Sequence, residues 1–331
     1  MRETTLRTPP HGAAALHALF ARTARRSENV ILPINDGALG TGNERPAFYC
    51  VHSLSGAGGT DFRELAKLMP DVRFYGIQAP TTKMQDAEFG RSVELLADHY
   101  ADALVRFQPD GPFLLGGWSA GATIALEIAQ TLLHRGREVR LLAAIDAAPE
   151  NTGAGLRPWH PLYLLELAAN LPGWVRHDLR KTSLRALVRR VSARITAAGK
   201  KAVIRDMGKP GLDLGFAVEG FVDLSRYPPD QKSFMKRLYN AVMEYNAVHY
   251  SEQVVVYEAK VKPLSHLPQV GAVWRKLAPR SVVIRVDGTH LSIMREGYVH
   301  VIAEDLRKRV TEGWSDAARG PLPIEPHPAG R

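Results

Sequence analysis

Short apolar segments alternate with helix-like segments in the first half of the chain, and this alternation limits the fold more than any other feature. Apolar runs predict strands at Ala47–His52, Val72–Gln78, Phe113–Trp118 and Val139–Ile145. Apolar residues spaced three and four apart predict the helices between them, at Phe62–Met69, Val93–Phe107 and Ala120–Leu133. Strands separated by helices form parallel sheets with right-handed crossovers, so the sequence predicts an α/β fold with a mostly parallel central sheet flanked by helices.

The alternation stops after Pro149, which predicts an insertion into the α/β core over residues 151–251. This insertion is helical, basic and poor in strands. The core then resumes with strands at 253–259 and 281–286 and helices near 273–277 and at 298–310. We expect residues 1–45 to be an N-terminal extension and linker, and residues 315–331, rich in Pro and Gly, to be a disordered tail. The domain is therefore predicted to span residues 46–314.

The positive charge of the chain is concentrated in the insertion. The chain has 43 basic and 34 acidic residues, a net charge of +9, and the segment 171–210 alone holds eleven basic and two acidic residues. A solvated helix face and a docking site for an acidic partner both explain such a segment. The docking hypothesis rests on Arg180, Arg185, Arg189 and Arg190.

The composition excludes several classes of protein. With 45% hydrophobic and 23% charged residues, the chain is neither disordered nor a fibrous repeat. Its single cysteine, Cys50, cannot form an internal disulfide, which agrees with a reducing cytoplasm. It contains no run of about 18 apolar residues, the length that indicates a membrane span.

The segment Gly117–Gly121 reads G-W-S-A-G and joins a predicted strand to a predicted helix. In that context a G-x-S-x-G pattern is typical of a nucleophilic serine on a tight, strained turn. Gly117 and Gly121 leave room for the backbone, and Ser119 lies at a helix N-terminus where free N–H groups favour a developing oxyanion. The sequence therefore predicts Ser119 as a nucleophile.

A nucleophilic serine needs a histidine base, and His290 is the best-placed candidate. In a fold with this strand–serine–helix turn, the order along the chain is the serine, then the acid, then the histidine. His290 follows the last predicted strand, in the loop D-G-T-H-L. His300 falls in the C-terminal helix, and His249 and His266 flank a strand without a glycine-rich turn. His52 precedes the serine and suits a structural role.

The acid that orients the base is predicted to be Asp146. In a fold with this serine turn, the usual place for the acid is after the strand that follows the insertion. There the chain reads K-V-K-P from Lys260, with no carboxylate. Asp146 ends the apolar strand before the insertion and faces the same rim as the serine. Glu258 and Asp287 remain as reserve candidates.

Two backbone N–H groups are expected to stabilise the oxyanion. The first belongs to Ala120, the residue after the nucleophile. The second comes from the glycine-rich turn after the first strand, either from Ser55 or from Leu54. No Lys-Ser/Thr pair follows that turn, so it is not a phosphate-binding P-loop.

These motifs resemble the thioesterase domains that end nonribosomal peptide and polyketide synthases, which have the α/β-hydrolase fold. The similar segments are F-Y-C-V-H from Phe48, F-R-E-L-A from Phe62, Y-G-I-Q-A from Tyr75, L-G-G-W-S-A-G from Leu115, R-G-R-E-V from Arg135 and G-T-H-L-S-I-M-R-E from Gly288. The resemblance covers about two-thirds of the chain, and the motifs keep their order. It departs from the family at Ala122, where a third glycine is frequent, and at Ser53–Ser55, which replace a turn containing proline.

The resemblance implies an enzyme that cleaves an acyl chain from the phosphopantetheine arm of a carrier protein. Ser119, His290 and Asp146 would form its triad, the insertion would form a helical lid, and no metal or bound cofactor would be needed. The acyl-serine would react with water to give an acid, or with an internal amine or hydroxyl to give a ring. Because carrier proteins of such synthases are acidic, the resemblance also supports docking at the basic segment.

Two other functions stay open at this point. A general carboxylesterase or lipase on the same fold would accept oxygen esters as readily as thioesters and would not need a carrier protein. A non-catalytic binding protein for nucleic acid or an acidic partner is disfavoured, because basic and aromatic residues do not interleave as a stacking surface requires.

Overall fold

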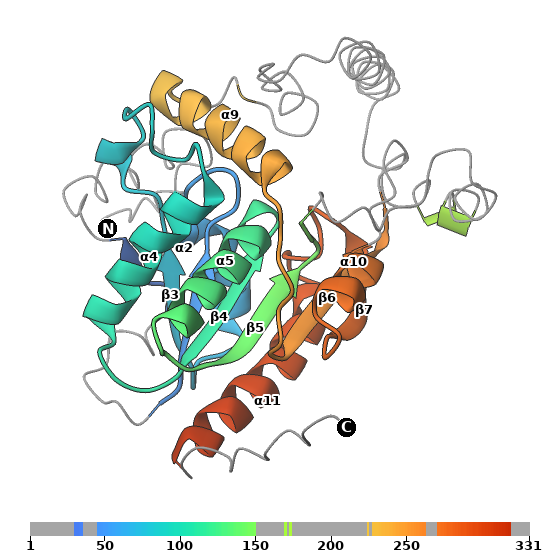
Figure 1. Cartoon of the computed structure of the whole chain (residues 1–331). Coiled ribbons are helices and arrows are strands. Elements are labelled where there is room, and N and C mark those ends of the chain that lie inside the picture. The colour runs from blue at the N-terminus through green and yellow to red at the C-terminus, as the bar shows by residue number, and fades with distance from the viewer. Residues whose placement is uncertain are drawn as a thin grey trace, which may run out of the picture.

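The computed structural model describes residues 30–35, 45–149, 169–170, 172–173, 224, 227–262 and 270–318. Its centre is a seven-stranded sheet in which only the first strand runs antiparallel to its neighbour (Figure 1). In spatial order the strands are β1 (Ile31–Pro33), β3 (Arg73–Ile77), β2 (Ala47–Val51), β4 (Phe113–Trp118), β5 (Val139–Ile145), β6 (Val254–Val261) and β7 (Val282–Thr289). This arrangement confirms the predicted α/β-hydrolase type of sheet.

Helices cover both faces of the sheet. One face carries α4 (Val93–Phe107), α5 (Ala120–His134), α9 (Pro229–Glu244) and α10 (Val270–Leu277), and the other carries α3 (Arg63–Lys67) and α11 (Val299–Ala318). The short helix α2 (Gly58–Asp61) and a 3-10 turn at Thr81–Lys83 connect the strands. Two apolar cores result, one on each side of the sheet.

The side chains of β2 show how one strand supplies both cores. Ala47, Tyr49 and Val51 pack in the cluster that includes α4 and α5, whereas Phe48 and Cys50 pack in the cluster that includes α3 and α11. Alternate residues of a strand point to opposite faces, and burial on both faces explains why the strand is apolar throughout.

The structure differs from the sequence-based expectations at the edges of the core. β1 lies within the stretch expected to be a linker, and it pairs with β3 through Ile31 and Ile77, so the domain begins before residue 46. The helix expected at Phe62–Met69 is present as the shorter α3, and the separate helix α2 precedes it and meets it at Phe62. At the other end α11 continues to Ala318, beyond the predicted start of the tail at residue 315. A three-residue edge strand is too short to leave a periodic pattern, which explains why the sequence did not reveal it.

The insertion is described only in part. Residues 227–251 include helix α9, while most of 151–226 lies outside the described residues. The four docking candidates Arg180, Arg185, Arg189 and Arg190 therefore also lie outside them.

Candidate active site

Ser119 occupies a strained turn between β4 and α5. Its backbone has φ 58° and ψ −130°, a left-handed conformation that side chains disfavour. A Cβ on Gly117 would lie 2.0 Å from the carbonyl oxygen of Gly121, and a Cβ on Gly121 would lie 2.4 Å from that of Val51. Only glycine fits at both positions, so this turn requires the two glycines of the G-x-S-x-G pattern.

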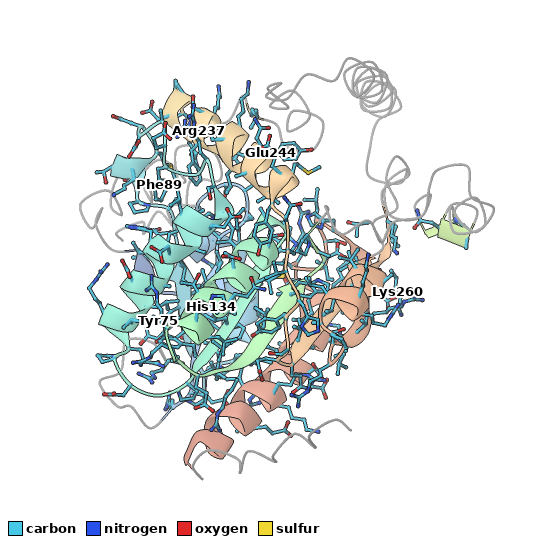
Figure 2. The ribbon with its side chains drawn as sticks, viewed as in Figure 1. Tyr75, Phe89, His134, Arg237, Glu244 and Lys260 are labelled. Atoms are coloured by element: carbon cyan, nitrogen blue, oxygen red, sulfur yellow. The ribbon has the colours of Figure 1, made fainter. Side chains whose placement is uncertain are left out.

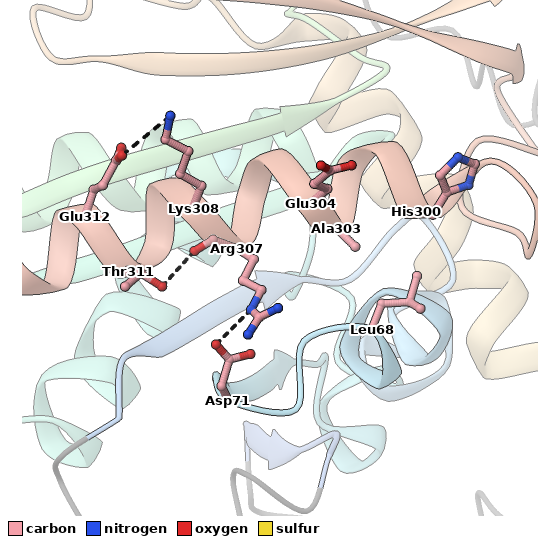
Figure 3. A pocket seen from close by; sticks show the side chains of 9 residues that line it. All are labelled: Leu68, Asp71, His300, Ala303, Glu304, Arg307, Lys308, Thr311 and Glu312. Atoms are coloured by element: carbon pink, nitrogen blue, oxygen red, sulfur yellow. Dashed lines mark hydrogen bonds and ion pairs between the residues drawn. The ribbon is translucent and has the colours of Figure 1, made fainter.

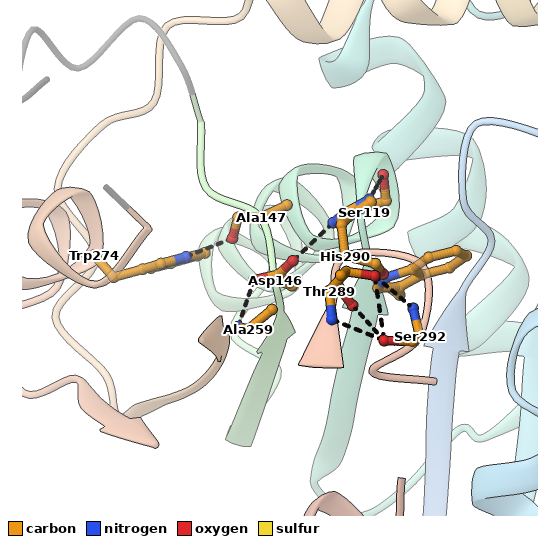
Figure 4. Close-up of polar contacts among 9 residues, drawn as sticks. Ser119, Asp146, Ala147, Ala259, Trp274, Thr289, His290 and Ser292 are labelled. Atoms are coloured by element: carbon orange, nitrogen blue, oxygen red, sulfur yellow. Dashed lines mark hydrogen bonds and ion pairs between the residues drawn. The ribbon is translucent and has the colours of Figure 1, made fainter. Parts of the chain in front are cut away.

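His290 connects the serine to an aspartate through two hydrogen bonds (Figure 4). Its Nε2 lies 3.1 Å from Ser119 Oγ, and its Nδ1 lies 2.9 Å from Asp146 Oδ2. Because a carboxylate only accepts hydrogen bonds, Nδ1 carries the proton and donates it to Asp146. The lone pair on Nε2 is then free to accept the hydroxyl proton of the serine.

Asp146 bridges two strands at the carboxyl end of the sheet. Its carboxylate accepts a second hydrogen bond from the Ala259 N–H at 2.7 Å, and its own N–H donates to the Tyr257 carbonyl at 2.8 Å. With φ 50°, Asp146 is also left-handed, and only 9% of its surface is exposed. The end of β6 has no carboxylate for this role, and it contributes a backbone donor to the acid instead.

The two alternative acids, Glu258 and Asp287, form ion pairs with lysines. Glu258 is buried in β6 and forms an ion pair with Lys262 at 3.0 Å. Asp287, in β7, pairs with Lys260 at 2.9 Å. Of these three carboxylates, Asp146 is the one that the structure brings to the histidine.

The rival His300 lies on α11 and lines an open groove of about 710 Å³ between α11 and the end of α3 (Figure 3). The groove is bordered by the exposed Leu68 and by the ion pair between Asp71 and Arg307. None of the three triad residues lines it. His266 lies outside the described residues.

A short turn and one aromatic side chain hold His290 in place. Ser292 Oγ accepts a hydrogen bond from the Thr289 N–H at 2.8 Å, which closes the turn around the histidine. The indole N–H of Trp118 donates to the His290 carbonyl at 3.2 Å, and the two rings stack with centroids 5.3 Å apart. The G-W-S-A-G pattern predicted the serine turn but no role for Trp118.

His52 fixes the turn that follows β2. Its Nδ1 lies 2.6 Å from the Ser53 carbonyl oxygen and its Nε2 lies 2.7 Å from the Tyr100 hydroxyl. Burial lowers the pKa of His52 to about 4, so the ring is neutral at pH 7, Nδ1 donates to Ser53, and Tyr100 donates to Nε2. In a trans peptide the N–H points opposite to the carbonyl, so the Leu54 N–H points away from His52.

The candidate oxyanion donors lie at the two turns just described. Ala120 is the first residue of α5, where backbone N–H groups have no intrahelical acceptor. Among the described residues, no hydrogen bond takes up the N–H of Leu54 or of Ser55. The Ser55 carbonyl, in contrast, accepts a hydrogen bond from Gln231 at 2.7 Å.

Two features are absent from the described part of the chain. No group of three or more His, Cys, Asp or Glu side chains there is placed to hold a metal ion. No helix among these residues has both the length and the apolar character needed to cross a membrane.

A mostly parallel sheet with a strained serine, a histidine and an aspartate hydrogen-bonded at its carboxyl edge defines the α/β-hydrolase class. Within that class, residues 46–191 match the family model described as "Thioesterase domain". The match confirms the resemblance found in the sequence.

The relatives with curated descriptions include large synthases. A non-reducing polyketide synthase of Aspergillus oryzae is 33% identical over 160 residues, which is 47% of this chain and 7% of that protein. A nonribosomal peptide synthetase of Aspergillus terreus is 30% identical over 153 residues, 46% of this chain and 16% of that protein. The chain thus matches only a small part of the length of these relatives.

Solved structures with the same fold include thioesterase domains. The NocB thioesterase domain from the nocardicin cluster has a TM-score of 0.53 at 22% identity, over 85% of this chain and 99% of that one. The surfactin thioesterase domain SrfTE has a TM-score of 0.50 at 16% identity, over 85% and 96% of the two chains. At these identities the comparison shows the shared fold.

Proposed function

We propose that this chain is a serine thioesterase that releases an acyl, peptidyl or polyketide chain from the phosphopantetheine arm of a carrier protein. One observation carries the proposal: Ser119, His290 and Asp146 form a continuous hydrogen-bonded relay. Ser119 and Asp146 lie within the segment that matches the thioesterase domain, and the curated relatives are synthases that build peptides or polyketides.

In the acylation step, Ser119 Oγ attacks the thioester carbonyl carbon while His290 Nε2 takes up the hydroxyl proton. Asp146 stabilises the imidazolium and keeps its orientation. The negative charge on the carbonyl oxygen is stabilised by the N–H of Ala120 and that of Leu54 or Ser55. The C–S bond then breaks, and the pantetheine sulfur leaves with the proton from His290.

In the second step, the acyl-serine reacts with water or with an amine or hydroxyl of its own chain. His290 removes a proton from the attacking group and returns it to Ser119 as the ester bond breaks. Water gives a free acid, whereas an internal nucleophile gives a ring. These steps need only groups of the protein, so we propose that no metal or bound cofactor takes part.

The partner is proposed to be an acyl or peptidyl carrier protein, free or within a synthase. In this proposal the insertion 151–251 shapes the acyl channel, and Arg180, Arg185, Arg189 and Arg190 attract the acidic carrier. A lone, fully buried cysteine supports a location in the reducing cytoplasm.

Release of free thiol from short acyl-pantetheine thioesters tests the function. Wild type and Ser119→Ala are compared on these thioesters and on matched oxygen esters, with intact-mass detection of an acyl adduct. We expect thioester turnover and an adduct, both of which Ser119→Ala abolishes. A preference for oxygen esters would reassign the chain as a general esterase, and turnover that survives in Ser119→Ala would refute the proposal.

A further inference from the structure

Gln231 on helix α9 makes a directed contact with the turn after β2. Its side chain is buried, with 5% of the residue exposed, and its Nε2 lies 2.7 Å from the Ser55 carbonyl oxygen. Because a carbonyl only accepts, the amide nitrogen must be the atom that faces Ser55. A buried amide with one well-defined acceptor fixes the position of that acceptor.

Side-chain hydrogen bonds hold helix α9 in the position from which Gln231 makes this contact. The Arg237 guanidinium donates to the carbonyls of Met84 at 2.7 Å and Phe89 at 3.2 Å, and Figure 2 shows Arg237 and Phe89 on neighbouring segments. At the start of the helix, Asp230 accepts a hydrogen bond from Gln85 at 3.0 Å. These contacts attach α9 to the segment after β3, so the helix cannot shift without breaking them.

The same helix also packs directly on the turn. Gly56 has φ +79°, and a Cβ there would lie 2.7 Å from Met84 Cε and 3.1 Å from Phe234 Cε1. The Phe234 ring, from α9, lies 6.1 Å from the His52 ring and stacks on Phe89 at 5.8 Å. The turn is thus enclosed between α9 and the core.

Two carbonyls on either side of the candidate oxyanion donors are fixed by side chains. His52 donates to the Ser53 carbonyl from the core, and Gln231 donates to the Ser55 carbonyl from α9. The peptide plane between Leu54 and Ser55 is therefore held at both ends. Since peptide planes are rigid, fixing the neighbouring carbonyls limits the directions of the Leu54 and Ser55 N–H groups.

We propose that Gln231 is a positioning residue through which the insertion sets the oxyanion hole. It acts through Ser55 and does not touch the reacting atoms. The inference rests on the proposed function, because it assumes that the turn after β2 stabilises the oxyanion. It assigns α9 a role in the chemical step besides any role in binding the acyl chain.

The test compares wild type with Gln231→Met, which keeps the length of the side chain but removes the donor. We measure kcat and KM on a short acyl-pantetheine thioester, and the rate at which an alkyl fluorophosphonate labels Ser119, by intact mass. A phosphonate adduct places its oxygen at the oxyanion position. We expect kcat and the labelling rate to fall about ten- to a hundredfold, with KM changed by no more than about twofold.

Leu238→Ala is the matched control, because Leu238 is buried on the same helix but contacts the apolar core. This variant should unfold at a lower urea concentration yet keep kcat within about threefold of wild type. Unchanged kcat and labelling in Gln231→Met, or a change in KM alone, would overturn the inference. If wild type failed to turn over thioesters, the proposed function would fail, while the labelling rates would still decide the role of Gln231.

Discussion

In the described part of the molecule, left-handed backbone at residues with a side chain occurs at two members of the proposed triad. Among the described residues, only Ser119 and Asp146 combine a side chain with a positive φ. Each such conformation costs about 1–3 kcal/mol and persists only where the surroundings impose it. For Asp146 these surroundings are the hydrogen bonds to Tyr257 and Ala259. The strain is therefore located where the orientation of two functional side chains depends on it.

Trp118 should affect the rate through the position of His290. Trp118→Leu removes both the hydrogen bond to the His290 carbonyl and the stacked ring, whereas Trp118→Phe keeps an aromatic ring. We expect kcat to fall about tenfold in Trp118→Leu and less in Trp118→Phe. Steady-state kinetics on a pantetheine thioester measure the effect, and equal rates in all three proteins would show that Trp118 does not position the base.

His52 should make stability depend on pH. Burial lowers the pKa of His52 to about 4 from an unfolded value near 6.5, so the unfolded chain binds a proton between these values and the folded chain does not. The contribution of neutral His52 to the free energy of unfolding is fully present above pH 6.5 and is lost as the pH falls toward 4. His52→Gln can still donate to Ser53 and accept from Tyr100, but it does not titrate.

Urea unfolding of wild type and His52→Gln at pH 7.5 and pH 5 measures this contribution. The free energy of unfolding of wild type relative to the variant should fall by about 2 kcal/mol between the two pH values. Carboxylates that titrate in the same range are common to both proteins, so their effects cancel. A difference independent of pH would mean that the pKa of His52 is the same in the folded and unfolded states.

The sequence was sufficient to predict the three residues that the structure brings together at the candidate site, because each lies in a local pattern. Ser119 lies between two glycines, His290 follows a strand, and Asp146 ends one. The supporting contacts could not be predicted in this way. The Trp118–His290 and Gln231–Ser55 hydrogen bonds join residues 172 and 176 positions apart, and nothing local marks either partner.

At the scale of elements, the close approach of α5 to β2 determines where the serine lies. Gly121→Ala would place a Cβ 2.4 Å from the Val51 carbonyl and 2.6 Å from the His52 carbonyl, both backbone atoms. We expect a loss of about 3 kcal/mol or more in unfolding free energy, together with a loss of turnover, because the start of α5 must move. Urea unfolding and thiol release measure the two effects.

Gly59→Ala is the control for this prediction. Gly59 lies in α2, its φ is not left-handed, and a Cβ there would meet nothing within 4 Å. The variant should retain wild-type stability and turnover. If both variants behaved alike, the close contact between α5 and β2 could not be the reason for the glycine.

Elements were predictable where a regular pattern extended over most of their length. The strands and helices of the core have such patterns, and they are present close to the expected residues. β1 has only three residues, and its place in the sheet depends on pairing with β3. Helix α9 was expected only as part of a helical insertion. Its position over the turn after β2 depends on tertiary contacts, which a local pattern does not reveal.

At the scale of the whole molecule, parallel strands bring distant segments of the chain to one edge. β4, β5 and β7 end next to Ser119, Asp146 and His290, although these residues are far apart in the sequence. β2 ends at the same edge and supplies the turn with the candidate oxyanion donors. The order of the strands therefore assembles the site, and the side chains then determine its chemistry.

The net charge should make recognition of a carrier protein depend on salt. The segment 171–210 accounts for the net charge of the chain, and attraction between exposed charges is screened over about 8 Å at physiological ionic strength. If this segment recruits an acidic carrier, KM for a carrier-bound thioester should rise at least about fivefold between 50 and 500 mM salt. KM for the uncharged pantetheine thioester should stay the same.

A double charge reversal, Arg185→Glu with Arg189→Glu, should raise KM for the carrier-bound substrate at low salt and remove most of its dependence on salt. Lys67→Glu with Lys308→Glu changes the net charge equally, but these exposed residues lie on α3 and α11. Because steering by overall charge would affect both variants, the comparison separates a local docking site from the net charge of the molecule. Equal effects of the two double reversals would contradict docking at the insertion and leave only long-range attraction.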